Sequence, residues 1–503
     1  MTLVSGIVGL YDSSGPDPGM VRRAVLGGPV LRGAPKLRTV DGWVLGILGD
    51  EGRDPRVVET ADSAVVVDAR VDAILDPLVA GLGEGGAGLF AGVLSALGPA
   101  GLQNVAGDFA AAHLARTTGM LTLARDAFGL RPLFWAARGG RLGFASDIET
   151  LIEMGLADGA VDVEAVRTML FEQGEYGDRT SFAGIRRVVA GRWVQLTTRG
   201  AFRGGRWFRP ERVPPDPTMS LFEAGQRTRD AILAAVADRA RGGVALFLSA
   251  GRDSSAVAVA LAEIGVKAVC LTYSFDLPGV YTEAPQARDL ARSLGHEWRE
   301  VPVHVGVPPE RASELGAIIG RPVNGVGAPI QLAMYDVIRE LQPDVVMSGE
   351  GGDLLFSAFP IAILDLIRHG KLRRAIETAR AFDRTWGYAY PFVAKVLVRG
   401  IAPRALLVAR ERSRERAPWL VRPARVRVRT DRSDAGYLRH LMTEGSDMTE
   451  SPERLFQAAG ASAVWPLVDL RVVDVALRFP VELRLPYPAP KQVLDAALLG
   501  ERG

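Results

Sequence analysis

Three short, almost entirely apolar runs in the second half of the chain constrain its fold more than any other feature. They are VALFL at 244–248, VKAVCLT at 266–272 and DVVM at 344–347, with helical patterns between them. Strands that are apolar on both faces are typical of parallel sheets covered by helices on both sides. We therefore predict a doubly wound α/β domain, in which ligands bind beyond the carboxyl ends of the strands.

The segment after the first of these runs predicts a phosphate site. Its sequence is SAGRDSS, at 249–255, and an apolar helical pattern follows it. Small residues let an anion reach the free backbone N–H groups of a helix N-terminus. The predicted nucleotide contacts in this segment are Ser249, Gly251, Arg252, Asp253, Ser254 and Ser255. Asp253 would repel phosphate unless a cation lay between them, so we also expect it to bind Mg²⁺.

A second predicted strand ends in a similar way. VVMSGEGGDLLF, at 345–356, passes from an apolar run into a glycine-rich turn with carboxylates. Since the carboxyl ends of parallel strands meet at one edge of a sheet, Asp353 is predicted to share metal and pyrophosphate with Asp253. Three further nucleotide contacts are expected at the strand ends: Tyr273 and, near the ribose and base, Ser348 and Gly349.

The pattern of apolar and turn-forming residues changes near residue 210. The first 200 residues alternate short apolar runs with glycine and aspartate turns, which is typical of a β-rich domain. The proline-rich segment RPERVPPDPT, at 209–218, is predicted to be a linker. SLFE at 220–223 then has the spacing of a helix-capping box at the start of a new domain. A stretch at about 358–432 is predicted to be helical and basic, either as a solvated face or as a platform for a peptide or partner protein.

Both loops resemble those of known enzymes. The first is similar to the Ser-Gly-Gly-x-Asp-Ser pyrophosphate loop of ATP pyrophosphatases, and the second to the S-G-E-G-A-D-E-L-F segment of the asparagine synthetase family. The resemblance extends over nearly the whole chain through GDFAAAHL (107–114), LARDAFGLRPLFWA (123–136), LGFASDIETLI (142–152), SFAGIRRVVAGRW (181–193), RDLARSLGHEWREV (288–301) and VWPLVDLRVVDVALRFP (464–480). It implies an inactive, glutaminase-like Ntn-hydrolase sandwich at 1–208, a linker at 209–219 and an ATP-binding, amide-forming domain at 220–503.

One catalytic residue of that family has no counterpart. Asparagine synthetases that use glutamine need an N-terminal cysteine as the nucleophile that releases ammonia. Here the matching segment, SGIVG, begins at Ser5 and contains no cysteine. A serine hydroxyl needs far more activation than a thiol, so we expect no glutaminase activity. The amine would then belong to the substrate, as it does in the related β-lactam synthetases and lasso peptide cyclases.

Two features favour a peptide substrate. Glu350 stands where β-lactam synthetases carry a tyrosine, and the basic stretch is longer than a small substrate requires. The resemblance then implies lasso peptide cyclisation: ATP, with Mg²⁺, adenylates an Asp or Glu side chain of a precursor peptide. The N-terminal amine of the peptide, deprotonated by Glu350 as general base, displaces AMP to form a macrolactam. A leader-binding protein and a leader peptidase would be further partners. A small-molecule amide ligase of the β-lactam synthetase kind and a non-catalytic scaffold remain alternatives.

Three positions depart from the family pattern within the site. Arg252 fills a place that is usually apolar, and it either binds phosphate or a carboxylate or points to solvent. In the segment PAPKQVLDAALLGERG, Lys491 matches the lysine of a T-K-x-x-L-R helix, whereas Asp495 replaces the arginine. The lysine of a following loop has no counterpart before Gly503. We expect Lys491 to stabilise developing charge in its place; an arginine from the basic stretch, a shortened chain and weak activity are the alternatives.

Composition argues against several other classes of protein. The chain has 60 Lys and Arg against 58 Asp and Glu, a net charge of +2, which gives no overall attraction to nucleic acid. The single cysteine, Cys270, cannot form an internal disulfide, which fits a reducing compartment. No run approaches the roughly 20 apolar residues of a membrane span, and the start lacks a signal-peptide pattern. We therefore predict a cytoplasmic protein without nucleic-acid or membrane partners.

The missing cysteine gives a first testable prediction. The protein should release no glutamate from glutamine, and Ser5→Ala should leave amide formation with a free-amine substrate unchanged, because no thiol nucleophile is available. A coupled glutamate assay measures the first outcome, and mass spectrometry of the amide product measures the second. Glutamate release above that of a heat-inactivated sample would contradict the prediction.

Overall fold

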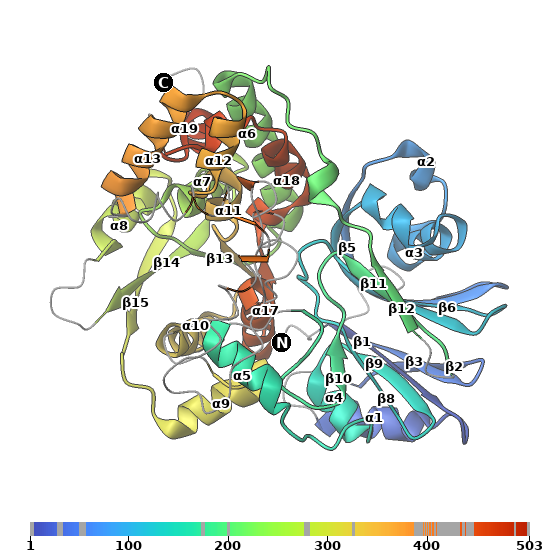
Figure 1. Ribbon diagram of the computed structural model, residues 1–503. Coiled ribbons are helices and arrows are strands. Elements are labelled where there is room, and N and C mark those ends of the chain that lie inside the picture. The colour runs from blue at the N-terminus through green and yellow to red at the C-terminus, as the bar shows by residue number, and fades with distance from the viewer. Residues whose placement is uncertain are drawn as a thin grey trace.

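The chain forms two parts that lie side by side (Figure 1). A β-rich N-terminal part contains β1 to β12, and an α/β part begins with α6 (Leu221–Arg239). The computed structural model describes residues 5–27, 34–49, 57–172, 177–198, 202–275, 282–323, 327–386, 447–486 and 489–499, with single positions between 387 and 446. Within these residues, no helix is both long enough and apolar enough to cross a bilayer.

The N-terminal part is a sandwich of two six-stranded antiparallel sheets, in the orders β10-β8-β9-β1-β3-β2 and β12-β11-β7-β6-β5-β4. The strands are β1 (Gly6–Asp12), β2 (Lys36–Val40), β3 (Trp43–Leu48), β4 (Val57–Glu59), β5 (Ser63–Ile74), β6 (Val105–Ala115), β7 (Met120–Arg125), β8 (Phe134–Arg138), β9 (Arg141–Ala145), β10 (Ile185–Arg187), β11 (Arg192–Leu196) and β12 (Phe202–Arg206). Trp43 and Leu45 from one sheet pack with Val66 and Leu123 from the other. This is the β-rich sandwich that the sequence predicts.

Helices cover the outer faces of the sandwich. They are α1 (Pro18–Gly27), α2 (Pro77–Ala80), α3 (Gly85–Ala96), η1 (Gly98–Asn104), α4 (Ile148–Glu153) and α5 (Val163–Glu172). Val21 and Val25 of α1 and Leu151 of α4 pack on the first sheet. Phe90 of α3 packs on Phe109 of the second sheet, with ring centroids 4.7 Å apart. Both sheets therefore have apolar side chains on their two faces.

The C-terminal part is built on a five-stranded parallel sheet in the order β15-β14-β13-β16-β17. Its strands are β13 (Val244–Phe247), β14 (Ala268–Phe275), β15 (Glu297–Val303), β16 (Val345–Ser348) and β17 (Ser462–Val464). All four residues of β13 are buried, so helices cover both faces of the central strand. In register, Phe247 lies opposite Leu271 on one side and Ser348 on the other, which brings the carboxyl ends of these strands together.

The helices of this part complete the predicted α/β architecture. After α6 they are α7 (Arg252–Glu263), α8 (Ala284–Ser293), α9 (Pro309–Ile319), α10 (Ala328–Leu341), α11 (Gly352–Phe356), α12 (Ala362–Arg368), α13 (Leu372–Trp386), α17 (Asp447–Ala459), η3 (Pro466–Val468), α18 (Leu470–Leu477), η4 (Val481–Arg484) and α19 (Gln492–Leu499). A short 3-10 helix, η2 (Pro210–Arg212), lies in the segment before α6. The predicted basic stretch begins with α12 and α13, and most of it beyond residue 386 lies outside the described residues.

Helix α6 begins where the sequence predicts. The Ser220 side chain accepts a hydrogen bond from the Glu223 N–H at 3.1 Å, which satisfies one of the free donors of the first turn. The start of α7 was predicted four residues too late. Gly251 is its N-cap, so Asp253, Ser254 and Ser255 lie in the first helical turn and not in a loop. Cys270 is fully buried in β14, and burial raises the pKa of its thiol to about 12.

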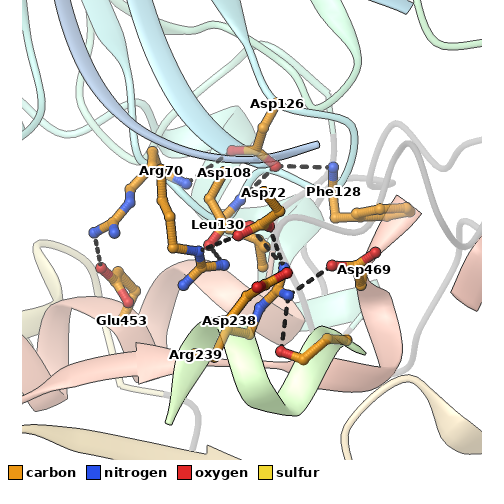
Figure 2. Close-up of polar contacts among 12 residues, drawn as sticks. Arg70, Asp72, Asp108, Asp126, Phe128, Leu130, Asp238, Arg239, Glu453 and Asp469 are labelled. Atoms are coloured by element: carbon orange, nitrogen blue, oxygen red, sulfur yellow. Dashed lines mark hydrogen bonds and ion pairs between the residues drawn. The ribbon is translucent and has the colours of Figure 1, made fainter. Parts of the chain in front are cut away.

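A buried guanidinium joins the two parts of the molecule. Arg239, the last residue of α6, contacts Asp72 of β5 at 2.7 Å and Asp469 at 2.6 Å, and all three side chains are 1% exposed. Arg70 pairs with Asp72 at 2.9 Å and with Asp108 of β6. Figure 2 shows these residues converging from both parts. Burial opposes ionisation of Asp469, but hydrogen bonding to Arg471 and the charge of Arg239 lower its pKa to about 2.

Helix α17 makes a second set of contacts with the N-terminal part. Glu453 pairs with Arg131 at 2.8 Å, with side chains 1% and 6% exposed. The next residue, Arg454, pairs with Glu149 of α4 at 2.8 Å. Burial raises the pKa of Glu453 to about 7, against the opposing charge of Arg131. The two parts are thus joined by largely buried ion pairs, in which losing one partner is costly.

We predict that Arg239→Met lowers the free energy of unfolding by about 3–5 kcal/mol, because it leaves Asp72 and Asp469 buried without their shared counter-charge. Arg227→Met, on the same helix, removes an ion pair to Glu223 whose side chains are 49% and 43% exposed, and should cost less than about 1 kcal/mol. Urea unfolding followed by circular dichroism measures both. Equal losses in the two variants would contradict this account of the interface.

Candidate active site

The two predicted loops pack directly on each other at the carboxyl edge of the parallel sheet. A Cβ atom at Gly352 would overlap the carboxyl carbon of Asp253, and one at Gly349 would lie 2.7 Å from the Asp253 carbonyl carbon. Gly351, between them, has a φ of 92°, a left-handed conformation that favours glycine. Glycines in the second loop therefore allow it to reach the first turn of α7.

The first loop is held by its own hydroxyl groups. Ser254 Oγ accepts a hydrogen bond from the Ser249 N–H at 3.0 Å and lies 2.9 Å from Ser249 Oγ. Ser255 Oγ donates to the Gly251 carbonyl at 2.8 Å. The Ala250 N–H donates to Glu283 Oε2 at 3.1 Å. A carboxylate thus occupies one backbone donor of the predicted phosphate loop.

Lys491 brings the two predicted metal ligands together. Its Nζ lies 2.5 Å from Asp253 Oδ2 and 2.6 Å from Asp353 Oδ1. The Lys491 and Asp253 side chains are 15% and 14% exposed, whereas Asp353 is 85% exposed. Lys491 immediately precedes α19 and has a φ of 55°, which is uncommon for a residue with a side chain. Outliers of this kind often occur at functional sites.

Two carboxyl groups of the site, those of Asp253 and Glu350, have pKa values above their ordinary range. Burial raises the pKa of Asp253, against the hydrogen bond and charge of Lys491. Glu350 is exposed, but partial desolvation of its carboxyl raises its pKa, and the charges of Asp353 and Asp253 add to this effect. Burial also raises the pKa of Tyr273, with a contribution from Glu350. The site therefore concentrates negative charge that a cation would stabilise.

Asp253 offers an oxygen atom suited to Mg²⁺. Asp253 Oδ1 is buried and has no hydrogen-bond partner within the part of the chain that the structure describes. An unsatisfied carboxylate oxygen is the kind of ligand that Mg²⁺ takes, together with oxygens from phosphates. Among the described residues, no group of three or more His, Cys, Asp and Glu is arranged to hold a metal. Asp253 and Asp353 could hold Mg²⁺ only with further oxygens from a ligand.

Arg252 pairs with the residue that departs from the family pattern in the C-terminal helix. Its Nε lies 2.5 Å from Asp495 Oδ1, and the side chains are 43% and 32% exposed. Arg252 therefore has a carboxylate partner within the chain, while part of its side chain still faces solvent. Phosphate or carboxylate binding by Arg252 stays a prediction.

The remaining predicted contacts lie at the same sheet edge. Ser348 is the last residue of β16, and its Oγ accepts a hydrogen bond from the Glu350 N–H at 3.3 Å. The Tyr273 ring stacks on Phe247 with ring centroids 5.3 Å apart. Glu283, which accepts a hydrogen bond from the N–H of Ala250, was not identified from the sequence. Glu283 follows β14, whereas Ala250 follows β13, and no local pattern indicates a contact between these two segments. A cavity of about 350 Å³ lies along β15 and α10, and none of the predicted site residues lines it.

Comparison of the sequence with models of known families identifies the family of this chain. The model of the asparagine synthase family matches residues 227–500, more than half of the chain. The chain belongs to the asparagine synthase family. Homologues in this family are ATP-dependent amide-forming ligases. A glutamine amidotransferase domain model matches residues 89–207.

Similar proteins cover about half of the chain. "Amidase chyE" from Penicillium rubens is 27% identical over 53% of this chain and 42% of its own length. "Asparagine synthetase [glutamine-hydrolyzing] 1" from Bacillus subtilis is 26% identical over 47% of this chain and 37% of its own length. The chain thus spans less than half the length of these relatives. The glutamine phosphoribosylpyrophosphate amidotransferase structure from B. subtilis gives a TM-score of 0.29 at 12% identity, covering 74% of this chain and 79% of that one.

Ser5, which begins the segment without a cysteine, has a buried partner. Ser5 directly precedes β1, and its Oγ donates to Asp68 Oδ2 at 3.1 Å. Asp68 is 3% exposed in β5. The one cysteine of the chain lies in β14 of the C-terminal part. The Ser5 hydroxyl is therefore hydrogen-bonded to a buried carboxylate, and no thiol lies in the N-terminal part.

The glycine contact between the two loops predicts the outcome of a small substitution. Gly352→Ala should weaken Mg-ATP binding at least about tenfold, because the new methyl group must push the second loop away from Asp253. Gly306→Ala is the matched control, since a Cβ there meets nothing within 4 Å. Calorimetric titration with Mg-ATP measures both, and circular dichroism confirms the fold. Equal affinities in Gly352→Ala and the wild type would contradict the proposed packing requirement.

Proposed function

We propose that this chain is an ATP-dependent ligase that forms an isopeptide macrolactam in a lasso precursor peptide. The observation that carries the proposal is the meeting of Lys491, Asp253 and Asp353 beside Glu350, in a member of the asparagine synthase family. The absence of cysteine from the segment beginning at Ser5 supports an amine supplied by the substrate. The precursor peptide, a leader-binding protein and a leader peptidase are the partners that this function would require.

The strand ends offer suitable groups for ATP. Hydroxyls of residues 249–255 and the backbone N–H groups at the start of α7 would hold the phosphates, and the N–H of Ala250 would exchange Glu283 for a phosphate oxygen. Tyr273, Ser348 and Gly349 would lie toward the nucleoside. Mg²⁺, held by Asp253 and Asp353, would neutralise charge on the departing phosphates. Lys491, already between these carboxylates, would remain a fixed positive charge beside the leaving group.

The first step activates a carboxylate. An oxygen of an Asp or Glu side chain in the peptide attacks the α-phosphorus of ATP, and the bond from that phosphorus to the bridging oxygen breaks. Pyrophosphate leaves with the electron pair, and the peptide becomes an acyl-adenylate. This exchanges a poor leaving oxygen for AMP. Residues of the two loops would hold the phosphates in line for this displacement.

The second step forms the amide. The N-terminal amine of the peptide attacks the activated carbonyl carbon, Glu350 accepts the proton of the amine, and the bond to AMP breaks. A raised pKa makes Glu350 a stronger base than an ordinary glutamate. Holding the amine and the carbonyl together removes an entropic barrier that can reach about 7–11 kcal/mol.

The two steps can be separated experimentally. Glu350→Gln should keep ATP–pyrophosphate exchange within about tenfold of the wild type, whereas amide formation should fall at least about 100-fold, because only the second step needs the base. Candidate core peptides with a free N-terminal amine serve as substrates, and mass spectrometry detects loss of one water. Glu310→Gln, exposed in the first turn of α9, is the matched control.

Three outcomes would contradict the proposal. Normal amide formation by Glu350→Gln would place the base elsewhere. Pyrophosphate release with small amino carboxylates, but with no peptide, would assign the chain to small-molecule amide ligases. Failure of the wild type to bind Mg-ATP would indicate a scaffold that keeps the fold without the chemistry.

A further inference from the structure

Two helix N-termini meet at the site through a reciprocal pair of ion contacts. Lys491, just before α19, reaches Asp253 in the first turn of α7. Arg252, also in that turn of α7, reaches back to Asp495 in the first turn of α19. The contacts join residues 238 and 243 positions apart. The start of each helix therefore contributes one cation and one carboxylate to this pair of contacts.

The second of these contacts leaves most of the Arg252 guanidinium available. Asp495 Oδ1 binds only Nε, and the structure records no partner for the two Nη atoms among the residues it describes. The Arg252 side chain is 43% exposed. Two Nη groups in a plane can bind an oxyanion side by side, while the Nε contact fixes the direction of the plane.

The place of Arg252 in the fold favours a phosphate as that oxyanion. Arg252 is the first residue of α7, directly after the N-cap Gly251. Lys491 lies beside the next residue, Asp253, at 2.5 Å. Two cations thus lie at the first turn of α7, where the helix N-terminus itself favours an anion.

We propose that Arg252 binds the phosphates that leave as pyrophosphate and that Asp495 is its positioning residue. The inference rests on the proposed function, since it deepens the assignment of the same site. It also explains two departures from the family pattern together, because the arginine gained in the loop pairs with the aspartate gained in the helix. An arginine stands in the loop where an apolar residue is usual, and an aspartate stands in the helix where an arginine is usual.

Calorimetry with inorganic pyrophosphate and Mg²⁺, and separately with AMP, tests the proposal without turnover. Arg252→Ala should weaken pyrophosphate binding roughly 10-fold or more, the scale of lost charge-assisted hydrogen bonds, and leave AMP binding unchanged. Arg292→Ala removes another exposed arginine, at the end of α8, and is the matched control. Equal pyrophosphate affinity in Arg252→Ala and wild type would overturn the assignment of Arg252, as would an equal loss of AMP binding.

The Asp495 variants test positioning separately. Asp495→Ala should weaken pyrophosphate binding roughly threefold, because the freed guanidinium must be ordered again on binding. Asp495→Asn keeps an acceptor oxygen for Nε and should stay within about twofold of wild type. Unchanged or tighter binding in Asp495→Ala would overturn the positioning role, since it would mean that Asp495 competes for the arginine. A wild type that binds neither pyrophosphate nor ATP would overturn the proposed function itself.

Discussion

The buried guanidinium of Arg239 is the contact on which the arrangement of the two parts depends. Arg239 is the last residue of α6, and it forms ion pairs with Asp72 of the N-terminal sandwich and with Asp469 at the start of α18. The same helix packs closely on α19, where a Cβ at Gly225 would lie 2.7 Å from that of Ala496. Helix α6 therefore contacts both the interface and the helix whose start carries Lys491. An N-terminal part without a thiol nucleophile still contributes buried counter-charges to the part that holds the site.

In the candidate site, too, positive side chains pair with carboxylates from distant segments of the chain. Each cation faces carboxylates: Lys491 lies between Asp253 and Asp353, and Arg252 lies on Asp495. Asp353 and Arg252, at 85% and 43% exposed, can change partners when an anion and a metal enter, whereas the Lys491–Asp253 contact is largely shielded, at 15% and 14%. The buried contacts of Arg239 lack that freedom. Burial thus distinguishes ion pairs that fix the fold from those available to a ligand.

Much of the fold could be predicted from local patterns. Apolar runs with both faces covered predicted the three central strands of the parallel sheet, and the capping box predicted the start of α6. The start of α7 was misjudged, because the small polar residues at 252–255 resemble a loop although Gly251 already caps a helix. Polar residues are common in a first helical turn, so composition alone does not separate it from a loop.

The sequence by itself determined the residue types of the site and their places at strand ends, since short-range patterns decide where strands stop and helices start. Family resemblance extended this to the asparagine synthase family, which the match over residues 227–500 supports. Only the tertiary structure decided that Lys491 reaches both aspartates, that Arg252 meets Asp495, and that Glu283 occupies the Ala250 N–H. These contacts join segments 33 to 243 residues apart. Side-chain pairing over such separations depends on how helices pack across the sheet, which no local pattern encodes.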